Sequence, residues 1–386
     1  MRGIKSSLQR ELDAFCKELE GGEFNIRGVT KGAFTQARAK LNPSAFVEMN
    51  DNIVGSFYSD APYLSWRGHR LLACDGTRLV LPDHATVREE FGVHGFGPNG
   101  DSQKSMATAS FLYDPLNFLV LDARIDAYSV GEGELLDRHL PKIGTNDLLL
   151  LDRGYPGVFL MLMLRHQKSD FCMRMSDQWL AARALKESGE KERTVTLSLA
   201  DKDKSRVDGF PGMETQIKVR LVCLELETGE KEVLCTSLLD EKKYPHGCFA
   251  GLYHERWGVE EGFKLFKSRV EVENFSGKTA NAVKQDFHAK VFMMSFMALM
   301  AFPIEELVRG ETFGKEGVAP KKINRTSAYE MTRNISISLF LHRAVNSAVN
   351  AFTWLVYKTT ELVRKGRKHE RKHKKKKQYH MNYKPL

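Results

Sequence analysis

A short stretch of the chain, residues 251–267, carries four polar side chains at helical spacing: Tyr253, Arg256, Glu260 and Lys267. At 100° per residue they fall within about 60° of arc, so one narrow stripe of a helix presents all four. A carboxylate flanked by an arginine, a lysine and a tyrosine combines a metal ligand with groups that hold phosphates. The stripe therefore indicates phosphoryl-transfer chemistry, although a solvated helix with an Arg256–Glu260 ion pair would show part of it.

The spacing Tyr-x2-Arg-x3-Glu-x6-Lys also resembles the signature of the insertion-sequence-four family of bacterial DDE transposases. Two further blocks are similar to those of the family, Asp-Gly-Thr at 75–77 and Asp-x-Gly-Tyr at 152–155. The resemblance implies three catalytic residues that are also the metal ligands: Asp75, Asp152 and Glu260. It implies three residues that hold DNA phosphates near the cleaved end: Tyr253, Arg256 and Lys267.

Taken alone, each aspartate has an ordinary structural explanation. Asp75 could start a turn with Gly76, because Asp-Gly is a frequent hairpin dipeptide. Asp152 could form an ion pair in a loop. The order Asp, Asp, Glu, with matching blocks around each residue, favours the catalytic interpretation. Other nearby acids are set aside: Asp83 lies in a turn, Asp147 precedes a strand, and Glu261 points away from the stripe. Asp122 and Asp126, acidic strand positions without a matching block, are assigned structural roles.

Converging carboxylates are tolerated where cations neutralise them. Mg²⁺ suits an all-oxygen site, Mn²⁺ is a plausible substitute, and phosphoryl transfer commonly uses two such ions. The resemblance implies water-driven cleavage at the ends of a mobile element, followed by attack of the freed 3′-hydroxyl on target DNA, through a hairpin intermediate. Two alternatives stay open: a ribonuclease-H-like nuclease without strand transfer, and an inactive nucleic-acid-binding relic.

Apolar patterning alternates between strand and helix through the middle of the chain. Strands are expected within 71–82, 105–128, 147–151 and 171–175, and helices at about 132–140, 158–165, 278–309 and 327–364. Asp75-Gly76 interrupts the first strand region, and Asp152 ends a run that implies a strand buried on both faces. Residues 190–240 show only β-patterned segments.

This order resembles an α/β fold, namely a ribonuclease-H-like catalytic core interrupted by an all-β insertion, with helical N- and C-terminal regions. The expected divisions are a DNA-end-binding region at 1–65, the core at 66–180 and 245–310, the insertion at 181–244, the helical C-terminal region at 311–363 and a basic tail at 364–386. The first region, which bears Lys31, Arg38 and Lys40, could equally be a simple helical pair.

The net charge of +9 comes from the tail, where eleven Lys or Arg face one acid and leave residues 1–363 at −1. Such a tail is expected to be disordered and to bind nucleic acid weakly without sequence preference. Six scattered cysteines predict reduced, mostly buried thiols. The apolar run at 291–302 is too short for a membrane span and predicts a core helix. We expect a cytoplasmic, nucleoid-associated bacterial protein that acts as a homodimer on DNA.

Overall fold

The computed structural model describes residues 7–22, 27–96, 102–226 and 228–363. The basic tail, which the sequence predicts to be disordered, lies outside the described residues. The chain divides into two compact units. The sheet unit comprises Pro62–Arg78 and Thr108–Gly262, and the helical unit comprises Met1–Ala61, Leu79–Ala107 and Phe263–Leu386.

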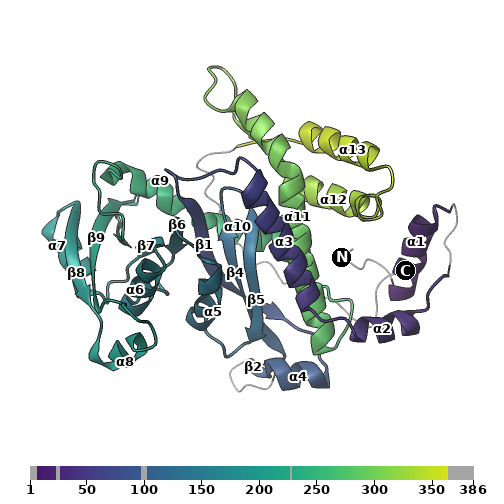
Figure 1. Ribbon diagram of the computed structural model, residues 1–386, viewed down its shortest axis with the longest axis horizontal. Helices are drawn as coiled ribbons and strands as arrows, with labels where there is room; N and C mark the ends of the chain where they lie inside the picture. The colour runs from purple at the N-terminus through teal and green to yellow at the C-terminus, as the bar shows by residue number, and fades with distance from the viewer. Residues whose placement is uncertain (1–6, 23–26, 97–101, 227, 364–386) are drawn as a thin grey trace. The chain divides into compact units, whose positions relative to one another are not determined.

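An eight-stranded sheet forms the framework of the sheet unit (Figure 1). Its strands are β1 (Arg70–Val80), β4 (Met106–Asp114), β5 (Leu119–Ala127), β6 (Asp147–Leu151), β7 (Asp170–Arg174), β8 (Glu192–Ser198), β9 (Gln216–Glu225) and β10 (Lys231–Thr236). They follow the order β5-β4-β1-β6-β7-β10-β9-β8. β1, β6 and β7 run parallel, whereas β10 is antiparallel to both β7 and β9.

Two strands of this sheet are buried along their whole length. Every residue of β4 and of β6 is buried, as expected for strands that are covered on both faces. The continuous apolar run of β6 confirms the strand predicted there. The turn between β4 and β5 is also confirmed, because the Asp114 carboxylate accepts hydrogen bonds from the backbone N–H groups of Leu116 and Asn117, both at 2.9 Å.

The helices of the sheet unit include the predicted ones and others that the strand patterning concealed. They are α5 (Glu132–His139), α6 (Val158–His166), α7 (Leu180–Ser188), α8 (Lys204–Val207), α9 (Phe249–His254) and α10 (Trp257–Ser268), whose last turns belong to the helical unit. α6 packs on β7 and β9, and α7 packs on β8, β9 and β10. The all-β character expected at 181–244 is not confirmed, because α7 and α8 lie there and β8–β10 extend the central sheet.

A long apolar helix organises the helical unit. The helices of this unit are α1 (Leu8–Glu20), α2 (Lys31–Ala39), α3 (Ser44–Asp60), α4 (Ala85–Phe91), α11 (Ala280–Thr312), α12 (Arg325–Phe340) and α13 (Val345–Lys358). Two short ribbons accompany them: β2 (His94–Phe96) with β3 (Ser102–Lys104), and β11 (Lys321–Lys322) with β12 (Glu361–Leu362). α11 packs against α3, α12 and α13 (Figure 1).

The apolar run at 291–302 lies inside α11. By length and composition α11 could cross a membrane, yet 56% of its most apolar window is buried inside the protein, as in a core helix. The single helix expected at 327–364 was wrong. The chain breaks between α12 and α13, where His342 and Ala344 adopt positive φ angles that a continuous helix does not contain.

Arg38 of α2 is an anchor within the helical unit. Its guanidinium forms an ion pair with Asp286 of α11 at 2.8 Å and donates a hydrogen bond to Gln285 Oε1 at 2.6 Å. It also donates a hydrogen bond to Ser276 Oγ. Only 14% of its side chain is exposed. Arg38 is therefore engaged in packing, while Lys31 and Lys40 of the same region are exposed.

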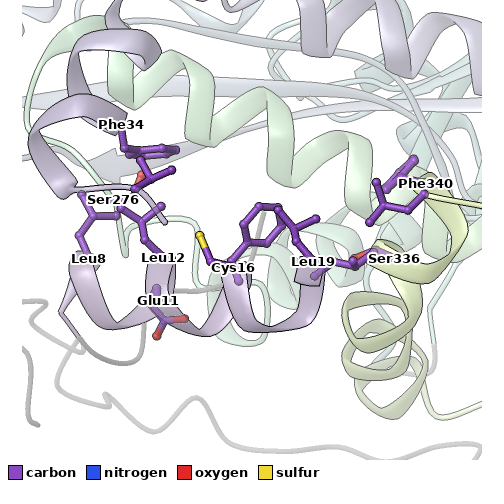
Figure 2. A pocket seen from close by; sticks show the side chains of 13 residues that line it. Leu8, Glu11, Leu12, Cys16, Leu19, Phe34, Ser276, Ser336 and Phe340 are labelled. Atoms are coloured by element: carbon purple, nitrogen blue, oxygen red, sulfur yellow. The ribbon is translucent and has the colours of Figure 1, made fainter. Parts of the chain in front are cut away.

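A mainly apolar cavity of about 520 Å³ lies between α1, α2 and α12 of the helical unit. Figure 2 shows Leu12 and Cys16 of α1 on one side of it, with Phe34 and Phe340 on the others. α1 buries only Leu12 and Cys16, so its packing is loose. All six cysteines are free and four are buried, which confirms the prediction of reduced, mostly buried thiols.

Candidate active site

Asp75 lies in the interior of β1. The strand continues from Arg70 to Val80, so the interpretation of Asp75-Gly76 as a turn was wrong. Gly76 serves a different purpose, because a Cβ placed on it would lie 2.6 Å from Cγ of Glu132 and 2.7 Å from its Oε1. A glycine in a strand often marks such a close approach. The first residue of α5 thus rests its carboxylate side chain against the segment that carries Asp75.

Asp152 follows the last residue of β6, as predicted. Because β1 and β6 are parallel, with Ala73 opposite Leu150, both strands direct their carboxyl ends to the same edge of the sheet. Tyr253 of α9 reaches this edge. Its hydroxyl lies 3.4 Å from the Leu151 carbonyl oxygen and 3.4 Å from Asp152 Oδ1, and it donates to these acceptors.

Arg256 and Glu260 form an ion pair at the start of α10. Arg256 Nη2 donates to Glu260 Oε1 at 2.9 Å, in the i,i+4 geometry expected from the sequence. The pair is unevenly buried, with 7% of the arginine side chain and 37% of the glutamate side chain exposed. α10 can start close to the β4–β5 turn because Gly258 has no side chain there: an added Cβ would lie 2.5 Å from Pro115.

One guanidinium brings the three predicted acids into a common neighbourhood. Arg256 interacts electrostatically with Asp75, with Asp152 and with Glu260, and Asp75 also interacts with Glu260. Among the described residues, however, no three Asp, Glu, His or Cys side chains are gathered with the spacing of metal ligands. Arg256 is therefore a cation close enough to each of the three predicted acids to influence its charge.

Burial and repulsion make the Asp75 carboxylate costly to ionise. Burial is the largest cause that raises its pKa from 3.8 to about 6, and the neighbouring Glu132 and Glu260 carboxylates add to it. The hydrogen bond from Gly76 N–H, at 2.8 Å, and the charge of Arg256 oppose this shift. Burial likewise raises the pKa of the Tyr253 hydroxyl, which therefore stays protonated.

The chemistry of this donor set fits a hard divalent cation. Asp75, Asp152 and Glu260 offer only carboxylate oxygens, the ligands that Mg²⁺ and Mn²⁺ accept. The side chain of Glu132, a fourth carboxylate, occupies the space where a side chain on Gly76 would lie. A cation beside Asp75 would offset the repulsion that raises its pKa.

The last residue of the stripe lies further along α10, and an exposed tryptophan lies at the start of that helix. Lys267 is in its last turn, is half-buried and belongs to the helical unit. Trp257, next to Arg256 in the chain, is 50% exposed. The Arg256 guanidinium lies 5.6 Å from the centre of the Trp257 ring, within the range of a cation–π contact.

Several nearby acids that were not predicted as site residues form ion pairs. Asp147, at the start of β6, accepts two hydrogen bonds from Arg70, at 2.7 and 2.6 Å. The others pair as follows: Asp83 with Arg88, Asp122 with Arg124 and His139, and Asp126 with Arg138. The sequence did not predict that Glu132 lies beside Asp75. The signal that could have revealed a close neighbour is Gly76, a glycine within a predicted strand.

Comparisons with known proteins show the family to which the chain belongs. A family described as Transposase DDE domain matches residues 66–297. The transposase InsG for insertion sequence element IS4 of Escherichia coli (strain K12) is 23% identical over 290 residues, which cover 73% of this chain and 63% of that protein. The chain thus spans just under two thirds of the length of this curated relative.

Among solved structures, a piggyBac transposase synaptic complex with hairpin DNA is similar at a TM-score of 0.39 and 12% identity, over 74% of this chain and 53% of that one. The match to the family of DDE domains rests on the sequence and covers more than half of the residues. The chain therefore belongs to the transposase DDE domain family, as its resemblance to the insertion-sequence-four transposases predicted.

Proposed function

We propose that the protein is the DNA transposase of an insertion sequence. It would cleave DNA strands at the ends of its element and transfer the freed 3′-hydroxyl to target DNA, with a hairpin intermediate between the two steps. The observation that carries this proposal is the electrostatic grouping of Asp75, Asp152 and Glu260 around Arg256, in a chain that belongs to the transposase DDE domain family.

The three acids would hold divalent metal, Mg²⁺ in the cell and Mn²⁺ as a substitute, with two ions in the full site. The metal would lower the pKa of a bound water and stabilise charge on the phosphate oxygens. Asp75 and Asp152 offer their carboxylates from adjacent parallel strands, and Glu260 offers its own from α10. The Tyr253 hydroxyl, bonded to Asp152, would orient that carboxylate as well as contact DNA.

Three groups would contact DNA at different depths. Arg256 is 5% exposed and Tyr253 is 6% exposed, so both suit a phosphate held at the metal site itself. Lys267 would contact a phosphate further along the strand. The exposed Trp257 ring offers a stacking face for a base displaced beside the cleaved phosphate.

The strand order β5-β4-β1-β6-β7 supports a ribonuclease-H-like core. We propose residues 66–180 and 245–310 as that core, 181–244 as its insertion, 1–65 as the DNA-end-binding region and 311–363 as the helical C-terminal region. A transposase that joins two element ends is expected to work as a homodimer on DNA, beside the chromosome in the bacterial cytoplasm. Its DNA partners would be the terminal inverted repeats and the target.

The test uses duplexes that carry the terminal repeats found beside the coding sequence, incubated with the full chain and Mg²⁺. Asp75→Asn, Asp152→Asn and Glu260→Gln should each abolish strand cleavage and leave binding to the duplex nearly intact. Glu261→Gln, the neighbouring position on α10, is the matched control and should cleave normally. Full cleavage by any of the three site variants would refute the assignment.

A second arm separates transposition from simple hydrolysis. A duplex with a pre-cut 3′-hydroxyl end is mixed with plasmid DNA, and joined products are scored on a gel. A transposase joins the end to the plasmid, whereas a nuclease without strand transfer only shortens it. Hairpin ends among the cleavage products, detected under denaturing conditions, would support the intermediate.

A further inference from the structure

A polar network is buried beneath Asp75 in the sheet unit. Ser110 of β4 and His139 of α5 are each 0% exposed, and Asp122 of β5 is 3% exposed. His139 Nδ1 lies 2.8 Å from Asp122 Oδ2, and His139 Nε2 lies 3.0 Å from Ser110 Oγ. Ser110 Oγ then donates to the backbone carbonyl oxygen of Asp75, at 3.2 Å. Three strands and α5 are thus linked by side chains.

The direction of each hydrogen bond follows from counting protons. The Asp75 carbonyl can only accept, so the single hydroxyl proton of Ser110 is used there. His139 Nε2 must then donate to Ser110, and Nδ1 donates to the Asp122 carboxylate. Both ring nitrogens of His139 are thus engaged, Nδ1 with the Asp122 carboxylate and Nε2 with the Ser110 hydroxyl.

The outer end of the network is fixed as well. Arg124, on the same strand as Asp122, donates to Asp122 Oδ2 at 2.8 Å through Nε. The pKa of Asp122 is lowered: burial works against this direction, and the hydrogen bonds and charges of His139 and Arg124 outweigh it. Asp122 therefore stays ionised and holds the His139 ring in one orientation.

A buried ionic network of this kind is a poor source of stability. Burying the charges costs several kcal/mol each, and well-packed apolar residues of equal volume often do as well or better. Its geometry indicates another role, because the inner end of the network, the Ser110 hydroxyl, donates to the backbone carbonyl of one residue. That residue is Asp75, whose carboxylate must be held in place if it is to bind a metal.

We propose that His139 is a positioning residue of the catalytic site: through the Ser110 hydroxyl it fixes the main chain at Asp75 and so orients that carboxylate for the metal. This inference rests on the proposed function, since it assumes that Asp75 is a ligand. His139 itself contacts neither DNA nor metal. α5 then acts on the Asp75–Gly76 segment from both of its ends, with Glu132 at its start and His139 at its end.

Two replacements of His139 separate positioning from packing. The amide nitrogen of Gln occupies the place of Nε2, so His139→Gln keeps the donor to Ser110 and gives up the one to Asp122. The amide nitrogen of Asn occupies the place of Nδ1, so His139→Asn keeps the donor to Asp122 and gives up the one to Ser110. Both variants lose one hydrogen bond and the ring, and only His139→Asn releases Asp75.

The measurement is Mn²⁺ binding to the full-length chain without DNA, by electron paramagnetic resonance, alongside unfolding in urea. We expect His139→Asn to weaken Mn²⁺ binding about 10-fold and His139→Gln to stay within about 2-fold of the wild type, as for supporting partners of metal ligands. Ser110→Ala, a small change at the same link, should weaken it about 10-fold. The double variant Ser110→Ala/His139→Asn should bind Mn²⁺ no more weakly than Ser110→Ala alone.

The outcomes distinguish this inference from the proposed function. If Asp75→Asn abolishes Mn²⁺ binding but the Asn and Gln variants of His139 bind it equally, or Ser110→Ala binds it as the wild type does, the positioning role is refuted and the metal site stands. If Asp75→Asn binds Mn²⁺ as the wild type does, Asp75 is not a ligand, and both proposals fail. If a His139 variant does not fold, the Mn²⁺ binding of Ser110→Ala decides alone whether the positioning role stands.

Discussion

Replacing Asp75 by Asn should stabilise the metal-free protein at neutral pH while removing its activity. The folded state holds the Asp75 pKa at about 6, above the value of 3.8 for an unperturbed aspartate, chiefly because of burial. A raised pKa of an acid means that the folded state prefers the protonated form. The favourable contribution is therefore fully present below about pH 4 and is lost as the pH rises through about 6.

The size of the effect follows from the shift. About two pH units at roughly 1.4 kcal/mol each give about 3 kcal/mol at pH 7.5. Asp75 is only partly buried, and solvent screening brings the expected value to about 2–3 kcal/mol. Asparagine keeps the shape and an oxygen that can accept from Gly76 N–H, but it carries no charge to desolvate.

The assay is urea unfolding of the wild type and Asp75→Asn in EDTA at intervals from pH 4 to pH 8. The free energies of unfolding should nearly coincide at pH 4 and diverge through pH 6, until the variant is more stable by about 2–3 kcal/mol. Asp208→Asn, at an exposed position of the same unit, is the control for the substitution itself. Adding Mn²⁺ at pH 7.5 should narrow the gap, because only the wild type would bind it well.

A constant difference between pH 4 and pH 8 would refute the reasoning, since it would mean that Asp75 ionises in the folded state as easily as in the unfolded chain. A variant that is less stable at pH 7.5 would also refute it. In that case the hydrogen bond from Gly76 and the attraction to Arg256 would outweigh burial and repulsion from Glu132.

Two further predictions concern Arg38 and Lys267. Arg38→Ala should lower the free energy of unfolding by about 3–5 kcal/mol, because Asp286 is left as a buried charge without its guanidinium; a loss below about 1 kcal/mol in urea unfolding would contradict this. Lys267→Ala should weaken binding to element ends and reduce the slope of log K against log salt concentration by about 0.9. Lys264→Ala is the control. If the slope for Lys267→Ala is unchanged and equals that of the control, Lys267 does not contact phosphate.

Much of the fold was predictable because its signals are local. The run at 147–151 is apolar at every position after Asp147, and only a strand covered on both faces uses such a run in a chain segment so short. The turn at Asp114–Asn117 carries its own hydrogen-bonding side chain. The helices within 181–244 were hidden because their short, charged sequences resemble turns, and α7 is held by its packing on β8, β9 and β10.

The proposed site residues could be named from the sequence for a different reason. Tyr253, Arg256 and Glu260 lie within eight residues of one another, so a spacing motif records their arrangement directly. No spacing motif in the sequence links Asp75 to the residues that surround it. Glu132 and His139 reach it from α5, about 60 residues away in the chain, and the placement of α5 depends on tertiary packing that no local pattern specifies.

Asp75-Gly76 illustrates how packing reverses a local signal. The dipeptide favours a turn because glycine tolerates unusual backbone angles and aspartate caps a neighbouring N–H. The Asp75 carboxylate does accept from Gly76 N–H, yet the strand continues, and the missing side chain of Gly76 instead admits Glu132. A turn would have directed Asp75 away from β6. In the extended strand Asp75 instead belongs to β1, which runs parallel to β6, so the proposed metal site would draw on both strands.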